Sequence, residues 1–195
     1  MVHALALCLL GWLAAAAPAL AESPPSPERN LFVFGGRITA ASMSSSVDFV
    51  GVPYEDNYLL GLGLQTWSWQ NSLVDIGYEG GIAHRFGEGT TTEIWAGVGL
   101  RCCRYQFRDV TLTPSLIVGL SHVDAPHPGR EADQVARDGG DASLLFYFTP
   151  ELELAPRNAD WSVFWRLHHR SGGGKTLGNM KGAANAHVLG IRLRF

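Results

Sequence analysis

The sequence predicts an all-β fold, an eight-stranded antiparallel β-barrel that crosses a membrane through its strands. Three observations lead to this prediction: the chain starts with an apolar segment typical of exported proteins, hydrophobic residues then recur at every second position, and the last strand ends in an aromatic residue. With 195 residues, of which 46% are hydrophobic and 17% charged, the chain has the size and composition of one folded domain.

The N-terminal segment reads as a secretory signal peptide, at residues 1–21. It is apolar, contains no Lys, Arg, Asp or Glu, and ends on Ala19, Leu20 and Ala21, the small-residue pattern of a signal-peptidase site. A retained membrane anchor is the alternative, because the segment is nearly long enough to span a bilayer and lacks basic residues at its start. Pro18 favours cleavage. We expect residues 22–30 to form a proline-rich lead-in and residues 31–195 to form the barrel domain.

Composition argues against several other classes of protein. Past the signal only Cys102 and Cys103 remain, and a bond between adjacent strand residues, which point to opposite faces, would be strained. No His or acidic residue stands at a metal-ligand spacing from them. The net charge of −3 gives no basic footprint for nucleic acid. We therefore expect no cofactor and no nucleic-acid partner.

Eight segments alternate between apolar and polar residues over roughly ten positions, which is the length of a tilted membrane-crossing strand. Within residues 74–86, for example, Val74 and Ile76 share one side of the strand while Asp75 and Glu79 share the other. No helical period of useful length appears in the chain. The predicted strands lie near residues 31–38, 58–67, 73–86, 91–105, 110–122, 143–154, 162–170 and 184–195.

Charged residues indicate which side of each strand faces lipid. They stand opposite the apolar positions, with both signs nearly balanced, so in a membrane barrel they would fill the lumen as ion pairs. Glycines such as Gly61 and Gly63 would leave room for them, and the filled lumen would be a plug rather than a pore. The alternative is a soluble barrel with these charges in water. The residues assigned to the lumen are Arg37, Asp75, Glu79, Arg85, Glu93, Arg101, Glu151, Glu153, Arg166, Arg192 and Arg194.

Loop lengths and the C-terminus favour the outer-membrane type of barrel. With both chain ends in the periplasm, the long connections 39–57, 123–140 and 171–183 lie outside, and the connections around 70–72, 106–109 and 156–160 are short inner turns. The terminal Phe195 resembles the C-terminal signature of bacterial outer-membrane barrels. We expect the chain to lie in the bacterial outer membrane, with outer-membrane lipid around it.

A candidate catalytic pair stands at the outer end of the seventh strand, in the segment LHHRSGGG at residues 167–174. His169 and Ser171 share the lipid-facing side, whereas Arg166 and His168 point into the lumen. Their Cα atoms would be roughly 7 Å apart, near enough for the imidazole to act as base for a serine nucleophile if the strand twists or ends there. The plainer interpretation is a polar rim at the membrane interface followed by a loop.

The chain resembles the PagL-type outer-membrane lipid A deacylases. The likeness lies in the outline of a signal peptide and a small barrel, and in a late His-x-Ser motif, His169, Arg170 and Ser171, followed by a glycine-containing loop and one last strand. It implies hydrolysis of an ester-linked acyl chain of lipid A, with Ser171 as nucleophile, His169 as base and the backbone N–H of Gly172 as oxyanion donor. Lipid A, or lipopolysaccharide, would be the substrate or a neighbour.

Two positions depart from the family pattern. The family has Asn after the serine and a Glu on the last strand, where this chain has Gly172 and Asn185, and no acidic residue follows Asp160. We expect Asn185, on the lipid-facing side of the neighbouring strand, to take part of the acid's role, because a carboxamide oxygen can accept the imidazole N–H. It supplies no counter-charge. The alternative is a barrel without catalysis that has a structural or surface-binding role.

Overall fold

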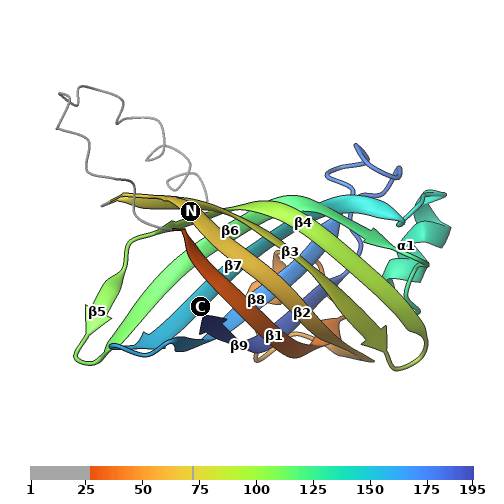
Figure 1. The fold of residues 1–195 in the computed structure, drawn as a ribbon. Helices are drawn as coiled ribbons and strands as arrows, with labels where there is room; N and C mark the ends of the chain where they lie inside the picture. Colours follow the sequence, from red (N-terminus) through yellow and green to blue (C-terminus); the bar gives the residue numbers. More distant parts are fainter. Residues whose placement is uncertain (1–26, 72) are drawn as a thin grey trace, which may run out of the picture.

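The computed structural model describes residues 27–71 and 73–195, whose strands close into one barrel (Figure 1). The barrel strands are β1 (Glu28–Thr39), β2 (Tyr54–Gln70), β3 (Val74–Phe86), β4 (Thr90–Cys102), β6 (Val110–Val123), β7 (Leu144–Pro156), β8 (Trp161–Ser171) and β9 (Asn185–Arg194). Each pairs antiparallel with its neighbours, and the β1–β9 and β4–β6 pairings complete the ring. The fold class predicted from the sequence is confirmed. The predicted signal peptide lies outside the described residues.

Three short elements lie outside the barrel wall. The 3-10 helix η1 (Ser45–Val47) is in the β1–β2 loop, helix α1 (Arg130–Asp138) is in the β6–β7 loop, and β5 (Tyr105–Phe107) pairs with β6 beyond the wall. The two ends of the barrel therefore differ (Figure 1). We call the end that carries η1 and α1 the outer rim, and the end that carries β5 and the first and last barrel residues the inner rim.

Helix α1 contradicts the expectation that the chain holds no helix of useful length. Glu131 and Asp133 lie in its first turn and Arg137 in its last, which suits the helix dipole. Gly139 follows in the left-handed conformation, with φ 61°, a usual helix ending. The helix has only nine residues, too few for its helical pattern to stand out in the sequence between two strands. Within the described residues, no helix is long and apolar enough to cross a membrane.

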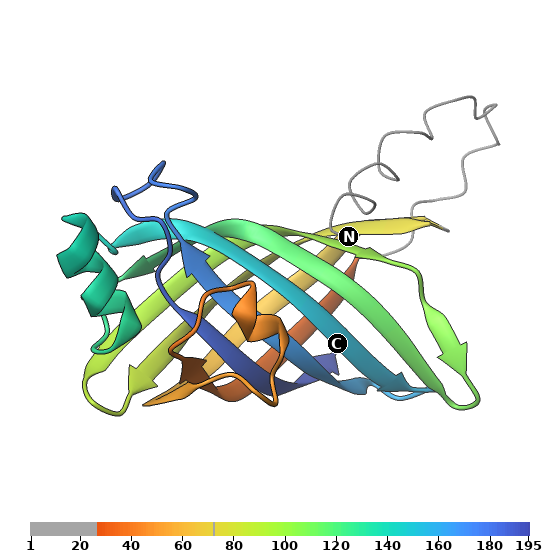
Figure 2. The ribbon, with the colours of Figure 1, turned by 180° about the vertical axis from the view of Figure 1, so that it is seen from behind.

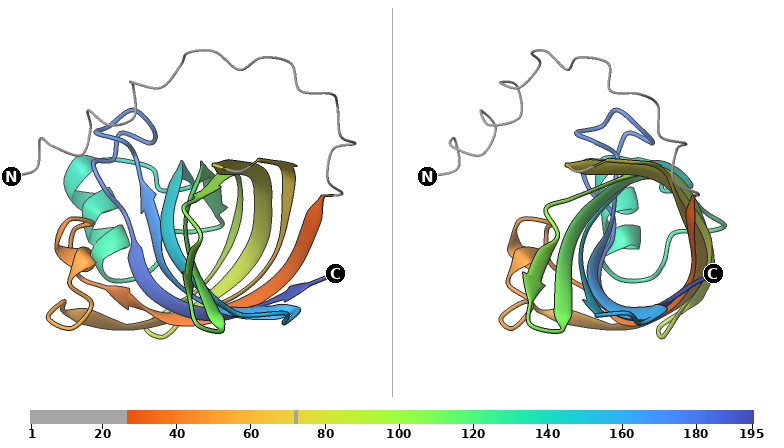
Figure 3. Two further views of the ribbon diagram at one scale, coloured as in Figure 1. Left: turned by 90° about the vertical axis from the view of Figure 1, so that its left-hand side faces the viewer. Right: turned by 60° about the vertical axis from the view of Figure 1, so that its left-hand side comes forward.

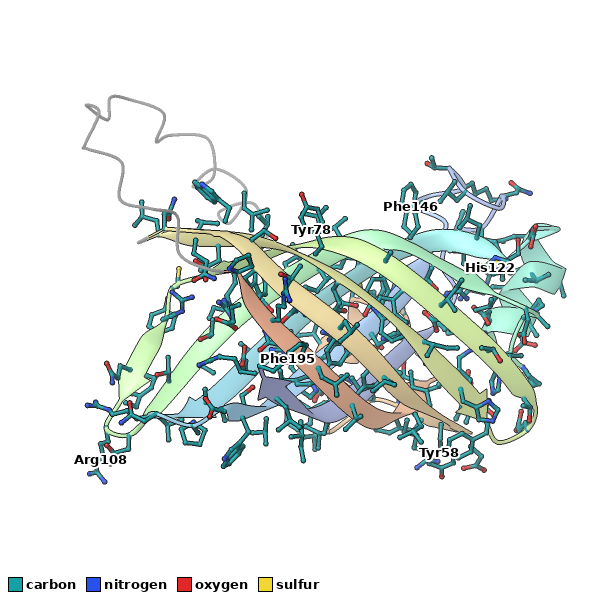
Figure 4. The ribbon with its side chains drawn as sticks, viewed as in Figure 1. Tyr58, Tyr78, Arg108, His122, Phe146 and Phe195 are labelled. Atoms are coloured by element: carbon teal, nitrogen blue, oxygen red, sulfur yellow. The ribbon has the colours of Figure 1, made fainter. Side chains whose placement is uncertain are left out.

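Apolar side chains face outward around the barrel. Leu60 is 61% exposed and Leu189 is 69% exposed, and Figure 4 shows Tyr78 projecting from the outer surface. Glu151 and Arg192, by contrast, are almost fully buried. A soluble barrel would show the opposite distribution, so the structure contradicts that alternative and confirms the predicted sidedness of these strands.

Ion pairs fill the middle of the lumen. The guanidinium of Arg166 lies 2.7 Å from a carboxylate oxygen of Glu79 and 2.7 Å from one of Glu151. Arg192 continues the network, at 2.9 Å from Glu151 and 2.8 Å from Glu153. All five side chains are buried, and they come from four strands, β3, β7, β8 and β9. The lumen is therefore a plug of paired charges, as the alternation predicts.

Aromatic rings also point inward, which the sequence analysis did not predict. Phe32 and Phe34 of β1 are buried in the lumen, and the guanidinium of Arg166 lies 5.0 Å from the centre of the Phe32 ring. Glycines on the facing strand make room for both rings. A Cβ at Gly61 would be 2.3 Å from the Phe34 ring, and one at Gly63 would be 2.3 Å from the Phe32 ring.

The assignment of Arg37 to the lumen is wrong. Because Phe32 and Phe34 hold the inward positions of β1, Arg37 points outward at the outer rim, where its 40% exposed side chain lies 2.8 Å from Asp56. Arg194 is 46% exposed at the inner rim. A charged side chain in the middle of the wall must point into the lumen to avoid lipid. At a rim it can also reach water on the outer side, so the charge alone does not show which side of the strand it occupies.

Candidate active site

Helix α1 lies across the outer rim, as the right-hand view of Figure 3 shows along the barrel. Its Glu131 points into the lumen, where it lies 3.0 Å from Arg85 and forms a second ion pair with Arg170. Arg170 is on β8, between His169 and Ser171, with its side chain buried on the lumen side. The helix is therefore fixed to the strand that carries the predicted catalytic pair.

The β1–β2 loop folds back over the outer face of β8 and β9 (Figure 2). The ring of its Phe49 lies 6.5 Å from that of Trp165 on β8 and 6.3 Å from that of His187 on β9. Ser42, Met43, Ser44 and Val47 of the same loop line a cavity together with His169, which points outward as predicted and is only 7% exposed. The expectation that it faces lipid directly is corrected, because a loop of the same chain covers it.

His169 and Asn185 lie opposite each other in the antiparallel pair of β8 and β9. The Nδ1 atom of His169 is 2.5 Å from the Oδ1 atom of Asn185. The amide is oriented by a second bond, because its Nδ2 donates to the carbonyl oxygen of Ala41 at 2.8 Å. With Oδ1 as acceptor, the imidazole proton belongs on Nδ1, and Nε2 is left as an acceptor. Nε2 is not fully buried and has no hydrogen-bond partner in the described part of the chain.

A cavity of about 570 Å³, here called the rim cavity, opens beside this pair. Three residues of the predicted site line it: His169 and Ser171 from β8 and Asn185 from β9. The structure thus brings them to one space at the outer rim, between α1 and the β1–β2 loop. The remaining residues that line the rim cavity are Ser42, Met43, Ser44, Val47, Arg130, Gln134, Arg137, Lys181, Gly182 and Ala183.

Ser171 and Gly172 occupy the end of β8 and the start of the following loop. Ser171 is half-buried, and among the described residues no hydrogen bond joins it to His169; such bonds are often long before substrate binds. Gly172 is buried, its carbonyl oxygen accepts from the N–H of Leu177 at 2.9 Å, and it does not line the rim cavity. The oxyanion role of its N–H stays a prediction.

The sequence analysis missed the part of the rim cavity that α1 provides. Arg130, Gln134 and Arg137 stand four and three residues apart, which places them on one side of the helix. The acidic first turn and Gly139 were the signals that could have revealed the helix. Nothing in the local sequence indicates that the helix lies beside β8, because that placement depends on the ion pairs of Glu131 inside the lumen.

A second hollow lies on the outer face, nearer the middle of the wall. It is a groove of about 550 Å³ across β6 to β9. Trp165 of β8 lines it, four residues before His169 on the same outward side of the strand. The other lining residues are Leu112, Leu152, Leu154, Val163, Phe164, Leu189, Gly190 and Ile191. Among the described residues no three His, Cys, Asp or Glu side chains form a group that could hold a metal ion.

Solved structures similar to this chain are outer-membrane β-barrels. The crystal structure of the outer-membrane enzyme PagL matches with a TM-score of 0.58 and 14% identity, over 84% of this chain and 98% of that one. The chain has the fold of a small outer-membrane β-barrel. Two further matches are the N-terminal barrel domain of Pseudomonas aeruginosa OprF, at 13% identity over 86% and 97% of the two chains with a TM-score of 0.49, and Yersinia pestis Ail, at 12% over 87% and 100% with a TM-score of 0.42.

At these identities the likeness extends to the fold and not to the chemistry. No family model matches the chain, and no curated protein matches it either. A fold does not by itself set the chemistry of a site. What this chain does must therefore be argued from its own rim cavity.

Proposed function

We propose that the chain is an outer-membrane esterase that removes an ester-linked acyl chain from lipid A or a closely similar lipid of the outer leaflet. The observation that carries the proposal is the 2.5 Å contact of His169 Nδ1 with Asn185 Oδ1, beside a cavity that Ser171 also lines. A histidine that was only part of a polar rim at the membrane interface would need neither a fixed tautomer nor an adjacent cavity. The resemblance to the lipid A deacylases in the His-x-Ser motif supports the same chemistry.

The proposed reaction proceeds through an acyl-serine. His169 Nε2 takes the hydroxyl proton of Ser171 while the serine oxygen attacks the ester carbonyl carbon. The bond to the leaving alcohol breaks, the same nitrogen returns the proton to the alcohol oxygen, and the acyl group stays on the serine. Water then loses a proton to Nε2 and attacks the carbonyl carbon of the acyl-serine. The bond to the serine oxygen breaks, Nε2 returns the proton to that oxygen, and the fatty acid is released.

Asn185 orients the imidazole without stabilising its charge. In serine proteases, replacement of the triad acid by an amide lowers kcat about 10⁴-fold, because the wrong tautomer is then favoured. Here Oδ1 of Asn185 faces Nδ1 of His169, and Nδ2 of Asn185 donates to the carbonyl oxygen of Ala41. This orientation favours the tautomer with the proton on Nδ1. What is lost is the counter-charge for the imidazolium. We expect a slow esterase rather than an inactive one.

The location of the site supports a membrane lipid as substrate. The outward face of the barrel is apolar and its charges are turned inward, which is the arrangement a bilayer requires. The long loops of the chain are at the outer rim, and membrane barrels have their longer loops on the extracellular side. In the outer membrane the rim cavity would therefore face the outer leaflet. The apolar groove that contains Trp165 lies on the same face of β8 and β9 and suits an acyl chain.

The test is hydrolysis by the full chain in detergent micelles with purified lipid A. We expect the wild type to release free fatty acid, and Ser171→Ala to lower the rate by at least about 10³-fold. Ser68→Ala, at an exposed serine toward the inner rim, is the matched control and should leave the rate unchanged. Equal release by the wild type and Ser171→Ala would refute the proposal and favour a barrel without catalysis.

A further inference from the structure

The wall of the rim cavity that α1 provides holds buried polar groups without partners. Gln134 is 2% exposed, yet neither its Oε1 nor its Nε2 makes a hydrogen bond within the described residues. The Nε of Arg130, one turn earlier, is buried and unpaired in the same part of the chain. Buried polar groups in native proteins nearly always have partners. Because both side chains line the rim cavity, a ligand bound there would supply the missing ones.

The charged side chains that line the rim cavity are all positive. Arg130, Arg137 and Lys181 line the rim cavity, whereas no described Asp or Glu does. Arg137 lies 3.2 Å from Asp138, but no carboxylate of the described residues lies within ion-pair distance of Arg130 or Lys181. Burial and the nearby Arg137 both lower the pKa of the Arg130 guanidinium, although the carboxylate of Glu55 opposes this. Because both guanidinium groups line the same cavity, an anion bound there would be attracted by both.

Part of the lining of the rim cavity is apolar, beside the hydroxyl groups of Ser42 and Ser44. Met43 and Val47 of the β1–β2 loop and Ala183 form this part. The groove that contains Trp165 continues the apolar outer face along β8 toward the middle of the wall. A ligand that fits both parts has an anionic head and an apolar body, as a membrane lipid does.

We propose that the rim cavity binds a phosphate-bearing lipid headgroup, with Arg130 and the Gln134 amide donating hydrogen bonds to phosphate oxygens. The proposal rests on the proposed function for the assignment of the rim cavity to a lipid, and it adds the headgroup chemistry that the cavity selects. A phosphate offers several strong acceptor oxygens to a guanidinium fork and an amide N–H. Arg137 and Lys181 add positive charge. The head would then hold the lipid with its ester next to Ser171.

Gln134→Leu gives a sharp test, because leucine has nearly the same shape and the amide makes no internal hydrogen bond that folding would lose. We expect this variant to be as stable as the wild type or more so. Arg130→Gln removes the charge and keeps the backbone N–H bond to Glu55. Arg157→Gln, at a 52% exposed arginine of the β7–β8 turn, is the matched control for loss of one charge.

Binding is measured by calorimetry in non-ionic detergent, with the full chain carrying Ser171→Ala so that nothing is hydrolysed. The probes are dioctanoyl phosphatidic acid, dioctanoylglycerol and inorganic phosphate. We expect the phosphatidic acid to bind at least about tenfold more tightly than the diacylglycerol, because charge-assisted hydrogen bonds are worth that factor or more. Gln134→Leu and Arg130→Gln should each weaken it about tenfold, whereas Arg157→Gln should not.

Three results would overturn the inference: equal affinity for the two lipids, phosphatidic acid binding that Gln134→Leu and Arg130→Gln leave unchanged, or inorganic phosphate binding as tightly as the phosphatidic acid. The last would make this a free-anion site. The outcome is separable from the esterase test. Phosphate-dependent binding without hydrolysis by the wild type would refute the esterase alone, and hydrolysis of charged and uncharged esters with the same kcat/KM would refute the headgroup site alone.

Discussion

The lumen and the rim cavity are both lined by buried polar side chains, but they differ in pairing. In the lumen each of the described buried carboxylates has a cationic partner, and Arg166 uses all three guanidinium nitrogens on Glu79, Glu151 and Tyr147. In the rim cavity, Gln134 and the Nε of Arg130 have no partner within the described residues. The buried charges of the lumen are thus balanced within the chain, although single atoms such as Thr149 Oγ1 and Arg192 Nε make no hydrogen bond there, whereas at Gln134 the whole amide is left unpaired.

Helix α1 explains how one chain maintains both regions. Glu131 satisfies Arg85 and Arg170 inside the lumen, while Gln134, three residues later, faces the rim cavity. The ion pairs fix the helix, and the fixed helix holds the unpaired groups where they cannot turn toward water. The buried ion pairs therefore stabilise the fold, and they offset the unfavourable free energy of keeping other polar groups unpaired in the rim cavity.

The largest expected effect lies in the lumen. Arg166→Leu leaves Glu79 and Glu151 buried with fewer cationic partners, and breaking a buried ion pair in this way costs about 3–5 kcal/mol. Unfolding by urea in detergent, followed by tryptophan fluorescence, measures the loss. Arg157→Leu, exposed and 3.8 Å from Asp109, is the control and should change the free energy of unfolding by less than about 0.5 kcal/mol. Similar losses for both variants would show that pairing in the lumen does not support the fold.

A middle-sized effect is expected at the contact of His169 with Asn185. Asn185→Leu removes the oxygen that orients the imidazole, and we expect kcat to fall about 100-fold with KM nearly unchanged, because the chemical step is impaired rather than lipid binding. Steady-state hydrolysis gives both constants, and circular dichroism checks that the barrel still forms. An unchanged kcat would mean that His169 needs no orienting partner.

The smallest effect concerns pH and the seating of α1. The imidazole of His127 is buried and its Nδ1 lies 3.0 Å from the Thr91 hydroxyl, while the backbone N–H of His127 donates to the Glu131 carboxylate at 2.9 Å. Burial and the nearby Arg85 lower the pKa of His127, although Glu131 opposes this. The opened loop therefore binds a proton more readily than the docked loop, and docking weakens as the pH falls below about 6.5.

Limited proteolysis of the β6–β7 loop at pH 7.5 and pH 5.5 measures this dependence. We expect modestly faster cleavage at the lower pH in the wild type, once the protease's own pH dependence is corrected with an unfolded substrate. His127→Gln cannot gain the proton and should be cleaved at the same corrected rate at both pH values. A cleavage rate of the wild type that does not change with pH would show that protonation of His127 does not weaken the docking of α1.

Much of the barrel could be predicted because the alternation of apolar and polar residues is a local property of each strand. Asp75, Glu79 and Glu151 alternate with apolar neighbours along single strands, so their burial in the lumen follows from strand geometry alone. The meeting of His169 with Asn185 on neighbouring strands could be anticipated in the same way. Arg37 was misplaced because it stands at a rim, where alternation no longer separates lumen from water.

The rest depends on contacts between distant parts of the chain. The β1–β2 loop, which lines the rim cavity beside His169, is held against the wall by Phe49 packing on Trp165 and His187. The polar wall of the rim cavity comes from α1, which is anchored by Glu131. Neither segment alternates between apolar and polar residues as a strand does, and both pack on strands that are distant in the sequence. The sequence therefore predicts the strands that carry the site and misses the loops that enclose it.

The most direct test of the account is the mass of lipid A from bacterial cells that express the full chain. The account predicts that the wild type lowers the mass of part of the lipid A by one acyl chain. Ser171→Ala and His169→Ala, present in the outer membrane at the same level, should leave it unchanged. Identical lipid A from all three strains, in a host whose lipid A carries ester-linked chains, would contradict the claim that the rim cavity is a catalytic site.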